Sequence, residues 1–331
     1  MSRRRFDLGD LLVGVRDGRP RAVARLISLV EDGAPELREV AAALAPYTGR
    51  AQVVGITGAP GVGKSTSVNV LVTALRAAGE KVGVLAVDPS SPFSGGALLG
   101  DRVRMQDHAL DDGVFIRSMA TRGHLGGIAS ATPQALRVLD AAGCDVVLVE
   151  TVGVGQSEVE VVSLADTTVV LLAPGMGDGI QAAKAGILEV ADVFVVNKAD
   201  RDGADQAVRN LKYMISLGRR DQAGPSWRPP IVRTVATKAE GVDDLVGAIA
   251  AHRDWMLGHG ELAARRQRRA EAEIEAIALA QLRARLGDVR RGSAGPGLPE
   301  LGLLELAKRV VAGELDPYRA ADELLAAFGS S

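Results

Sequence analysis

Cysteine and aromatic residues are scarce in this sequence. Its 331 residues include a single cysteine, Cys144, so no disulfide can form within the chain. Aromatic residues make up 3% of the chain, which leaves few side chains to stack on nucleic-acid bases. The four histidines are scattered, and no metal-binding cluster of His and Cys is visible. We therefore expect Cys144 to be a small buried residue and the protein to function in a reducing, cytoplasmic compartment.

The sequence also lacks an excess of either charge and any long apolar segment. Lys and Arg number 39 against 41 Asp and Glu, which gives a formal net charge of −2 at pH 7. This balance provides no electrostatic attraction for nucleic acid or for an anionic lipid surface. No segment reaches the ~18 apolar residues of a membrane-spanning helix, and the N-terminal residues lack the apolar core of a secretory signal. We therefore predict partners that include neither nucleic acid nor a membrane.

Short apolar runs rich in Val and Ile are abundant, within a chain that is 47% hydrophobic. They do not alternate apolar with polar residues, which is typical of parallel strands buried on both faces. Helix-length segments, such as 65–78 and 205–217, separate most of the runs. This alternation predicts an α/β fold with a mostly parallel, doubly wound sheet. The runs cover residues 53–56, 82–87, 114–116, 146–149, 169–172, 193–196 and 231–235.

Helical patterns flank this region on its N-terminal side. Within residues 7–45, apolar side chains recur at spacings of three and four. Pro20 and Pro35 mark the expected first turns of helices, and Gly18 and Gly33 the expected ends. We therefore predict an N-terminal helical extension over residues 1–48.

The pattern becomes helical again after about residue 241. Ile274, Ala278, Leu282 and Leu286 form a row at a spacing of four. The Arg-rich stretch 265–269 is interpreted as a solvated helix face. Residues 292–299 resemble a loop, and helices are expected near 300–312 and 317–328. The sequence thus predicts an α/β domain over residues 49–258 and a C-terminal helical region over residues 259–331.

A phosphate-binding loop is the strongest functional signal. One segment fits the pattern G-x-x-x-x-G-K-[ST] at every fixed position, between an apolar strand and an apolar helix. Its glycines let consecutive backbone N–H groups point at phosphate oxygens, and the helix N-terminus adds to that field. We expect the lysine to contact the β- and γ-phosphates, the serine to bind Mg²⁺ and the threonine to reach the α-phosphate. The residues concerned are Gly58, Ala59, Pro60, Gly61, Val62, Gly63, Lys64, Ser65 and Thr66.

Acidic residues follow two of the predicted strands. Glu150 ends the run 146–149, where a carboxylate commonly holds Mg²⁺ directly or through water, and Gly153 could donate its N–H to the γ-phosphate. Asp88 ends the run 82–87, and Asp101 lies in the Gly-, Pro- and Ser-rich segment that follows. Ligands of such sheets bind at the carboxyl ends of the strands. We therefore predict Ser65, Asp88, Asp101 and Glu150 as Mg²⁺ ligands.

A base-recognition motif follows the run 193–196. Asn197, Lys198 and Asp200 form the pattern N-K-x-D. The two carboxylate oxygens of Asp200 can accept from N1–H and the exocyclic amino group of guanine, a donor pair that adenine does not offer. Asn197 can donate to the O6/N7 side, and the Lys198 stem can lie along the ring. Backbone N–H groups near Ala236 and Thr237 could meet O6, so GTP and GDP are the predicted ligands.

Several longer runs resemble the MeaB/ArgK family. They are GAPGVGKST (58–66), VDPSSPFSGGALLGDRVRM (87–105), RGHLGG (122–127), ETVGVGQSE (150–158), APGMGDGIQAAKAGILEVADVFVVNKAD (173–200) and ATKAEG (236–241). The resemblance covers roughly residues 10–330. It implies a P-loop GTPase of the signal-recognition and MinD-like class that acts as a chaperone of adenosylcobalamin-dependent methylmalonyl-CoA mutase.

The resemblance also implies roles for individual residues and a quaternary state. Asp88, Asp101 and Glu150 match positions for Mg²⁺ and hydrolysis, and Lys184 matches a mobile basic residue in a third switch, residues 176–186. Together with Lys64, the residues Asp101, Glu150 and Lys184 are the predicted catalytic set. The C-terminal helices would form most of a homodimer contact. The mutase could equally be a related acyl-CoA mutase, such as isobutyryl-CoA mutase.

Three other functions stay open at this point. The family also carries a description as an ATPase or kinase of arginine and ornithine transport, against which the Asp200 argument favours guanine. A metallochaperone for nickel or zinc usually carries His-rich tracts or paired cysteines, which this chain lacks. A module that holds nucleotide only as a structural clamp would show no hydrolysis stimulated by a partner. No residue that orients water, and no arginine finger, can be named, so slow intrinsic turnover is expected.

Overall fold

The computed structural model describes residues 7–89, 107–108, 110–121, 131–151, 163–175, 190–217, 226–290 and 303–329. The chain divides into two compact units, Met1–Arg269 and Ala270–Ser331. The domain boundaries expected at residues 48 and 258 remain a prediction.

A seven-stranded parallel sheet forms the centre of the first unit. Its strand order is β3-β2-β4-β1-β5-β6-β7, and every neighbouring pair is parallel. Each of the seven apolar runs in the sequence lies in one strand, which confirms the predicted α/β fold. The strands are β1 Gln52–Gly58, β2 Val82–Pro89, β3 Val114–Thr121, β4 Val146–Thr151, β5 Thr167–Leu172, β6 Val193–Asn197 and β7 Ile231–Thr234.

Burial within the sheet depends on the position of each strand. Every residue of β1, β4, β5 and β6 is buried, as expected for strands covered on both faces. The edge strand β7 differs, because only Val232 and Thr234 are buried among its four residues. The expectation of two-sided burial is therefore wrong for β7 and also for β3 at the opposite edge of the sheet, where Val114, Phe115 and Ile116 are only partly buried.

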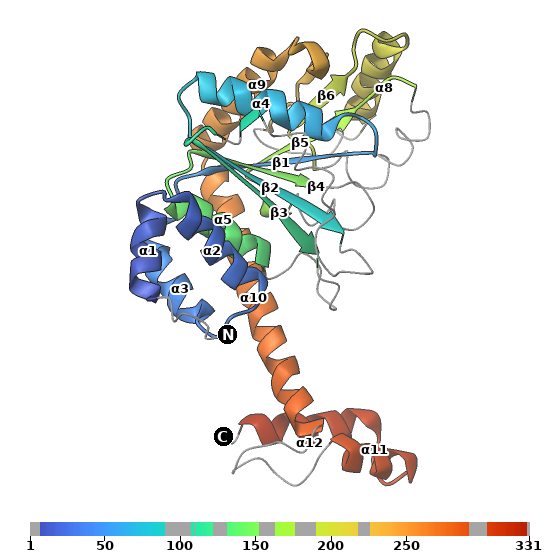
Figure 1. Ribbon diagram of the computed structural model, residues 1–331. Coiled ribbons are helices and arrows are strands. Elements are labelled where there is room, and N and C mark those ends of the chain that lie inside the picture. Colours follow the sequence, from blue (N-terminus) through green and yellow to red (C-terminus); the bar gives the residue numbers. More distant parts are fainter. Residues whose placement is uncertain are drawn as a thin grey trace. The chain divides into compact units, whose positions relative to one another are not determined.

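Helices cover both faces of the sheet (Figure 1). On one face, α4 (Lys64–Ala77) and α9 (Val242–Gly258) pack on alternate strand residues such as Val54 and Ile56. On the other face, α5 (Ala131–Ala141) and the N-terminal helices pack on intervening residues such as Val53 and Val147. The helix α8 (Ala204–Leu217) packs on Phe194 and its neighbours on that same second face. Since successive strand residues point to opposite faces, each strand contributes to both layers.

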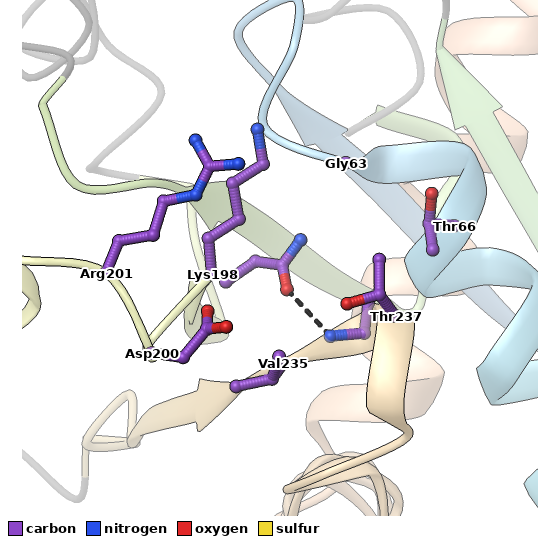
Figure 2. A pocket seen from close by; sticks show the side chains of 9 residues that line it. Gly63, Thr66, Lys198, Asp200, Arg201, Val235 and Thr237 are labelled. Carbon is purple, nitrogen blue, oxygen red and sulfur yellow. Dashed lines mark hydrogen bonds between the residues drawn. The ribbon is translucent and has the colours of Figure 1, made fainter.

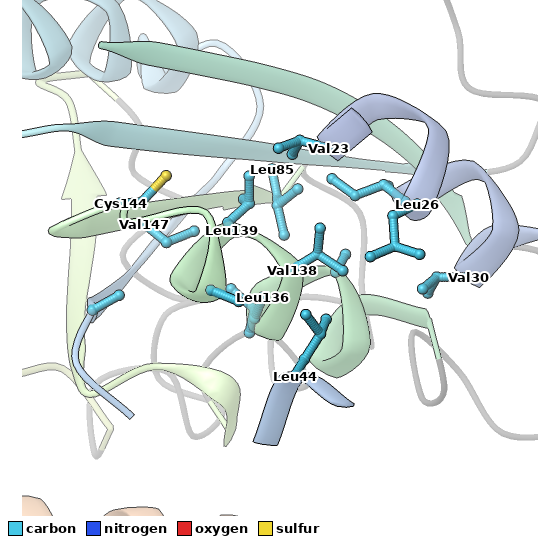
Figure 3. Close-up of a cluster of buried hydrophobic side chains, with 14 of the residues drawn as sticks. Val23, Leu26, Val30, Leu44, Leu85, Leu136, Val138, Leu139, Cys144 and Val147 are labelled. Atoms are coloured by element: carbon cyan, nitrogen blue, oxygen red, sulfur yellow. The ribbon is translucent and has the colours of Figure 1, made fainter. Parts of the chain in front are cut away.

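The three N-terminal helices are α1 (Leu8–Arg16), α2 (Pro20–Glu31) and α3 (Leu37–Leu44), and a 3₁₀ turn follows at Ala45–Tyr47. Pro20 is the first residue of α2, as predicted, and Gly18 and Gly33 follow α1 and α2 with φ of 69° and 63°. Figure 3 shows how Val23, Leu26 and Val30 of α2 face α5 and the sheet. The helical extension is thus part of the hydrophobic core of the first unit.

Cys144 lies at the edge of this core, 9% exposed. Burial raises the pKa of its thiol to about 12. The expectation of a small buried cysteine is confirmed.

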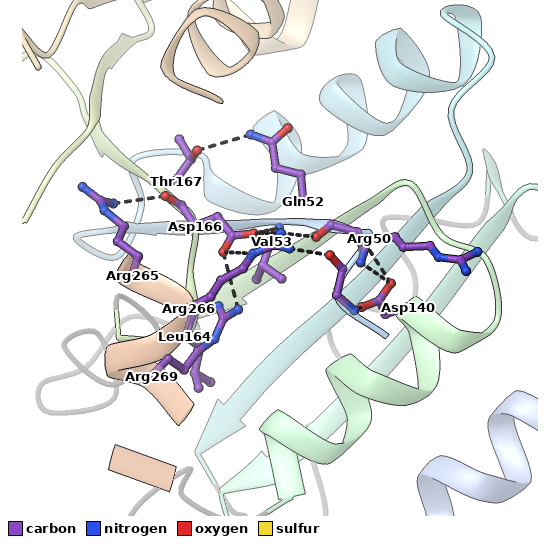
Figure 4. Close-up of polar contacts among 12 residues, drawn as sticks. Arg50, Gln52, Val53, Asp140, Leu164, Asp166, Thr167, Arg265, Arg266 and Arg269 are labelled. Atoms are coloured by element: carbon purple, nitrogen blue, oxygen red, sulfur yellow. Dashed lines mark hydrogen bonds and ion pairs between the residues drawn. The ribbon is translucent and has the colours of Figure 1, made fainter. Parts of the chain in front are cut away.

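The arginines in the first turns of α10 (Glu261–Arg290) are paired with buried acids, contrary to the predicted solvated face. Arg266 pairs with Asp166, which is fully buried, through Nη2 and Oδ2 at 2.8 Å (Figure 4). Arg269 also contacts Asp166 at 3.5 Å and donates to the carbonyl of Leu164. Arg265 binds both carboxylate oxygens of Asp192 at 2.7 and 2.8 Å. Within 265–269, the interpretation as a solvated face is therefore wrong for these three arginines.

The physical reason lies in two acids that precede strands. Asp166 precedes β5 and accepts from the backbone N–H of Val53 at 3.0 Å, and Asp192 precedes β6. Buried carboxylates need compensating charge, which the arginines of α10 supply. Burial by itself raises the pKa of Asp192, but hydrogen bonds from His252 and Arg265 outweigh this effect and lower it.

The second unit is helical. Besides the C-terminal part of α10 it contains α11 (Leu303–Val311) and α12 (Pro317–Gly329), close to the predicted ranges. Leu306 is buried, and Arg309 pairs with Glu323 at 2.8 Å. In the part of the chain that the structure describes, no helix combines the length and apolar character needed to cross a bilayer.

Candidate nucleotide-binding site

The carboxyl ends of β1, β4, β6 and β7 carry the residues that the sequence singled out. The loop between β1 and α4 contains the predicted phosphate-binding segment, and Glu150 lies in β4 opposite Ile56 of β1. Asn197 ends β6, and a 3₁₀ turn at Ala236–Lys238 follows β7. The fold thus places both predicted half-sites at one edge of the sheet, where ligands of such sheets bind.

Three glycines shape the loop. Gly58, Gly61 and Gly63 have φ of 146°, 80° and 96°, a region that residues with a side chain rarely adopt. A Cβ on Gly58 would lie 2.3 Å from the carbonyl oxygen of Leu171 in β5. A Cβ on Gly63 would lie 2.5 Å from Nδ2 of Asn197. The motif glycines are therefore required both by backbone conformation and by close approach.

Lys64 begins α4 and folds back over this loop. Its Nζ donates to the carbonyls of Gly58 at 2.5 Å and Ala59 at 3.3 Å, and the residue is only 8% exposed. The ammonium group is thus held at the inner side of the loop, next to the helix N-terminus. Both features favour an anion there.

Ser65 and Glu150 meet beside the loop. The Ser65 hydroxyl donates to Oε1 of Glu150 at 2.7 Å, and Glu150 is 1% exposed. A hydroxyl and a carboxylate in contact offer the hard oxygen ligands that Mg²⁺ prefers. The described residues therefore fit a Mg²⁺ site at the position that the sequence predicted.

The base half-site is a pocket of about 110 Å³ between β6, β7 and the phosphate-binding loop (Figure 2). Its acidic residue is Asp200, and the side chains of Lys198 and Arg201 lie next to one another above it in Figure 2. The residues that line it are Gly63, Thr66, Asn197, Lys198, Asp200, Arg201, Val235, Ala236 and Thr237. Because Gly63 and Thr66 come from the phosphate-binding loop and α4, the two half-sites are continuous.

Asn197 and Lys198 join the half-sites. The buried amide of Asn197 donates through Nδ2 to the carbonyl of Val62 at 2.8 Å. Its Oδ1 accepts from the Thr234 hydroxyl and from the N–H of Ala236, each at 3.1 Å. Nζ of Lys198 donates to the carbonyl of Gly61 at 2.6 Å. The Asn197 side chain thus connects the phosphate-binding loop, β7 and the 3₁₀ turn after β7. A direct contact between Asn197 and the base remains a prediction.

Most of the chain matches the model of a known family. Residues 23–289 match the family described as methylmalonyl Co-A mutase-associated GTPase MeaB. The chain belongs to the MeaB family. As a MeaB-family protein with this loop and this base pocket, it is a P-loop GTPase.

Relatives of this MeaB-family chain come from archaea, bacteria and a mammal. A protein of Pyrococcus abyssi, described by its name as a GTPase, is 47% identical over 319 residues, 96% of each chain. The methylmalonic aciduria type A homolog of Mus musculus is 36% identical over 97% of this chain and 79% of its own length. The GTPase ArgK of Escherichia coli is 37% identical over 78% of this chain and 80% of its own length.

A solved structure resembles the MeaB-family chain along its full length. The crystal structure of an LAO/AO transport system kinase has a TM-score of 0.68, 27% sequence identity and full coverage of both chains. This similarity supports the same fold.

Some predicted residues of the MeaB-family site lie beyond what the structure describes. Asp101, Gly153 and Lys184 are outside the described residues. Of Asp88 only the backbone is described, near the end of β2 and in register with Ala120 of β3. Their proposed roles remain predictions.

One pocket residue was missed in the sequence, Arg201. Arg201 is placed by a turn in which its N–H donates to the carbonyl of Lys198 at 3.0 Å, with Lys198 at a φ of 56°. The one available signal was that Arg201 directly follows Asp200. Val235 follows β7 and lines the pocket together with Ala236 and Thr237, the residues next to it in the predicted base-binding segment.

Proposed function

We propose that this MeaB-family GTPase requires Mg²⁺ and uses its two nucleotide states to act as a chaperone of an adenosylcobalamin-dependent acyl-CoA mutase, first of all methylmalonyl-CoA mutase. The observation that carries the proposal is the continuous site in which Asn197 and Lys198 bind the phosphate-binding loop while Asp200 lines the base pocket.

Guanine selectivity rests on Asp200. Its carboxylate can accept from N1–H and the amino group of guanine. Ala236 and Thr237 line the same pocket, and because the N–H of Ala236 already donates to Asn197, the N–H of Thr237 is the proposed donor to O6. Adenine would leave the carboxylate without donors at a cost of about 1–3 kcal/mol. GTP and GDP are therefore the proposed ligands.

Hydrolysis transfers the γ-phosphoryl group from the β-phosphate oxygen to water. Lys64 and the backbone N–H groups of residues 58–66 would bind and stabilise the phosphate oxygens. Ser65 and Glu150, in contact at 2.7 Å, would hold Mg²⁺, with Asp88 and Asp101 as further predicted ligands. When bound, Mg²⁺ supplies positive charge to the phosphate oxygens. Gly153 keeps its predicted role beside the γ-phosphate, and Lys184 keeps its predicted role as the mobile basic residue of the third switch.

The partner and the quaternary state follow from different observations. The family description and the mouse relative's name point to methylmalonyl-CoA metabolism. A homodimer is favoured by large apolar side chains exposed on the helices after residue 269, among them Ile274 at 67%, Leu304 at 72% and Val311 at 89%. Since GTP and GDP differ in their contacts with the loop, binding to the mutase would depend on the nucleotide state and gate cofactor loading and protection.

The experiment is a GTPase assay titrated with purified methylmalonyl-CoA mutase, with and without adenosylcobalamin, beside calorimetry with GTP, GDP and ATP. We expect guanine selectivity, slow basal turnover and stimulation by the mutase. Lys64→Ala should abolish hydrolysis and weaken nucleotide binding. Equal affinity for ATP and GTP would reject the guanine assignment. A phosphorylated protein acceptor would instead support the kinase alternative, and the absence of stimulation would reject the chaperone role.

A further inference from the structure

Asp200, the proposed guanine-binding residue, forms an ion pair with a lysine. Nζ of Lys238 lies 3.5 Å from Oδ2 of Asp200, with side chains 55% and 42% exposed. We propose that Lys238 is a positioning residue for guanine: it orients the Asp200 carboxylate and compensates its charge while the base is bound. This inference rests on the proposed guanine selectivity and adds a residue to it.

Internal hydrogen bonds fix the backbone of the loop that carries Lys238. The N–H of Lys238 donates to the carbonyl of Val235 at 2.8 Å, and Val235 and Glu240 exchange backbone hydrogen bonds of 3.0 and 3.3 Å. Gly241 closes the loop at a φ of 75°, where a Cβ would lie 2.0 Å from the carbonyl oxygen of Arg233. The lysine side chain therefore starts from a fixed point.

The segment that carries Asp200 is attached to the same loop. The N–H of Ala199 donates to the carbonyl of Thr234 at 3.0 Å. Oδ1 of Asn197 accepts from the N–H of Ala236 at 3.1 Å. These two hydrogen bonds connect the segment before Asp200 with the segment before Lys238. The two side chains therefore approach one another from backbone segments that are held together.

The ion pair leaves room for the base. A carboxylate offers about four acceptor positions, and the contact between Nζ of Lys238 and Oδ2 is longer than a tight hydrogen bond. Two donors of guanine can therefore bind Asp200 without displacing the lysine. The base would remove water from the carboxylate, and a neighbouring ammonium group reduces the cost of that desolvation.

The pair should matter for binding rather than for folding. Ion pairs between exposed side chains contribute little to stability, because water screens them. In the nucleotide complex the base covers Asp200, the screening falls and the attraction grows. Asp200 is the one acid among the described residues that line the pocket, so the attraction of Lys238 within the pocket acts on this carboxylate.

The test is calorimetry of GDP binding to the full-length protein and three variants. Lys238→Ala should weaken binding about fivefold, and Lys238→Arg, which keeps the charge, should restore most of it. The control is Lys308→Ala, which removes another exposed lysine from its 3.2 Å pair with Glu305 in α11. It should leave GDP affinity unchanged. Lys238→Ala that binds GDP like the wild type would overturn the proposal.

A double-variant cycle separates positioning from a merely structural role. Asp200→Asn should favour xanthosine diphosphate, because the amide can donate to the C2 carbonyl of xanthine. The amide carries no charge, so adding Lys238→Ala to Asp200→Asn should leave xanthosine diphosphate affinity unchanged. A fivefold loss there as well would mean that Lys238 acts through the loop and would reject the proposal.

Failure of the two proposals can be told apart. If the wild type binds ADP as tightly as GDP, the guanine assignment itself is rejected. If the wild type prefers GDP and Lys238→Ala keeps its full affinity, only the role of Lys238 is rejected.

Discussion

Gly63 separates the phosphate-binding loop from α4, and its missing side chain makes room for Asn197. The amide nitrogen of Asn197 would lie 2.5 Å from a Cβ at this position and donates to the neighbouring carbonyl of Val62. The same amide accepts from Thr234 and Ala236 at the base pocket. Phosphate and base recognition thus depend on one another through a single pair of residues.

We predict that Gly63→Ala weakens GDP binding by roughly 10- to 100-fold, because the methyl group displaces Asn197 and the backbone is strained. Gly61→Ala is the matched control, since Gly61 has a similar φ of 80° but no atom within 4 Å of the added Cβ. It should show the smaller loss that strain alone produces. Calorimetry with both variants measures the difference, and equal losses would contradict the role given to Asn197.

Local sequence patterns predicted the parts of the site that lie within motifs. The loop from Gly58 to Thr66 and the N-K-x-D residues lie together as expected, because strand ends of a parallel sheet meet at one edge. Arg201 and Lys238 could not be identified, since neither belongs to a motif position with a side-chain role. Their places depend on how the turn after Asp200 faces the loop after β7.

Among the elements, strands were easier to predict than the contacts of helices. Seven Val- and Ile-rich runs gave seven strands. In the fully buried strands β1, β4, β5 and β6, burial on both faces accounts for the continuous apolar run. The first turns of α10 misled the interpretation because Arg265 and Arg266 look like solvated charges. Their partners, Asp192 and Asp166, lie more than seventy residues away in sequence.

We predict that Arg266→Ala lowers the free energy of unfolding by about 2–4 kcal/mol, because it leaves the buried Asp166 undercompensated. Arg269 keeps a 3.5 Å contact with Asp166 and limits the loss. Arg268→Ala is the control on the same helix, since Arg268 is 60% exposed and pairs with Glu261. It should cost less than about 1 kcal/mol. Urea unfolding followed by circular dichroism measures both, and similar values would refute the anchoring role of Arg266.

The candidate nucleotide site lies in one of the two units of the molecule. Every described residue of the candidate nucleotide site lies between Gly58 and Lys238, within the unit Met1–Arg269. The unit Ala270–Ser331 contains none of the described site residues and exposes several large apolar side chains, including Leu282, Tyr318 and Leu325. Nucleotide binding and self-association are therefore expected to be separable functions of one chain.

A chain that ends at Arg269 tests this separation. It keeps the site and the arginines that hold α10 to β5 and β6, so we expect GDP affinity within about twofold of the full chain. It loses the exposed apolar side chains of the second unit, so it should be monomeric where the full chain is a dimer. Calorimetry and light scattering measure the two properties on the same samples. A dimeric fragment would place the interface in the first unit. A monomeric fragment that has lost GDP binding would show that assembly completes the nucleotide site, and the separation of the two functions would have to be abandoned.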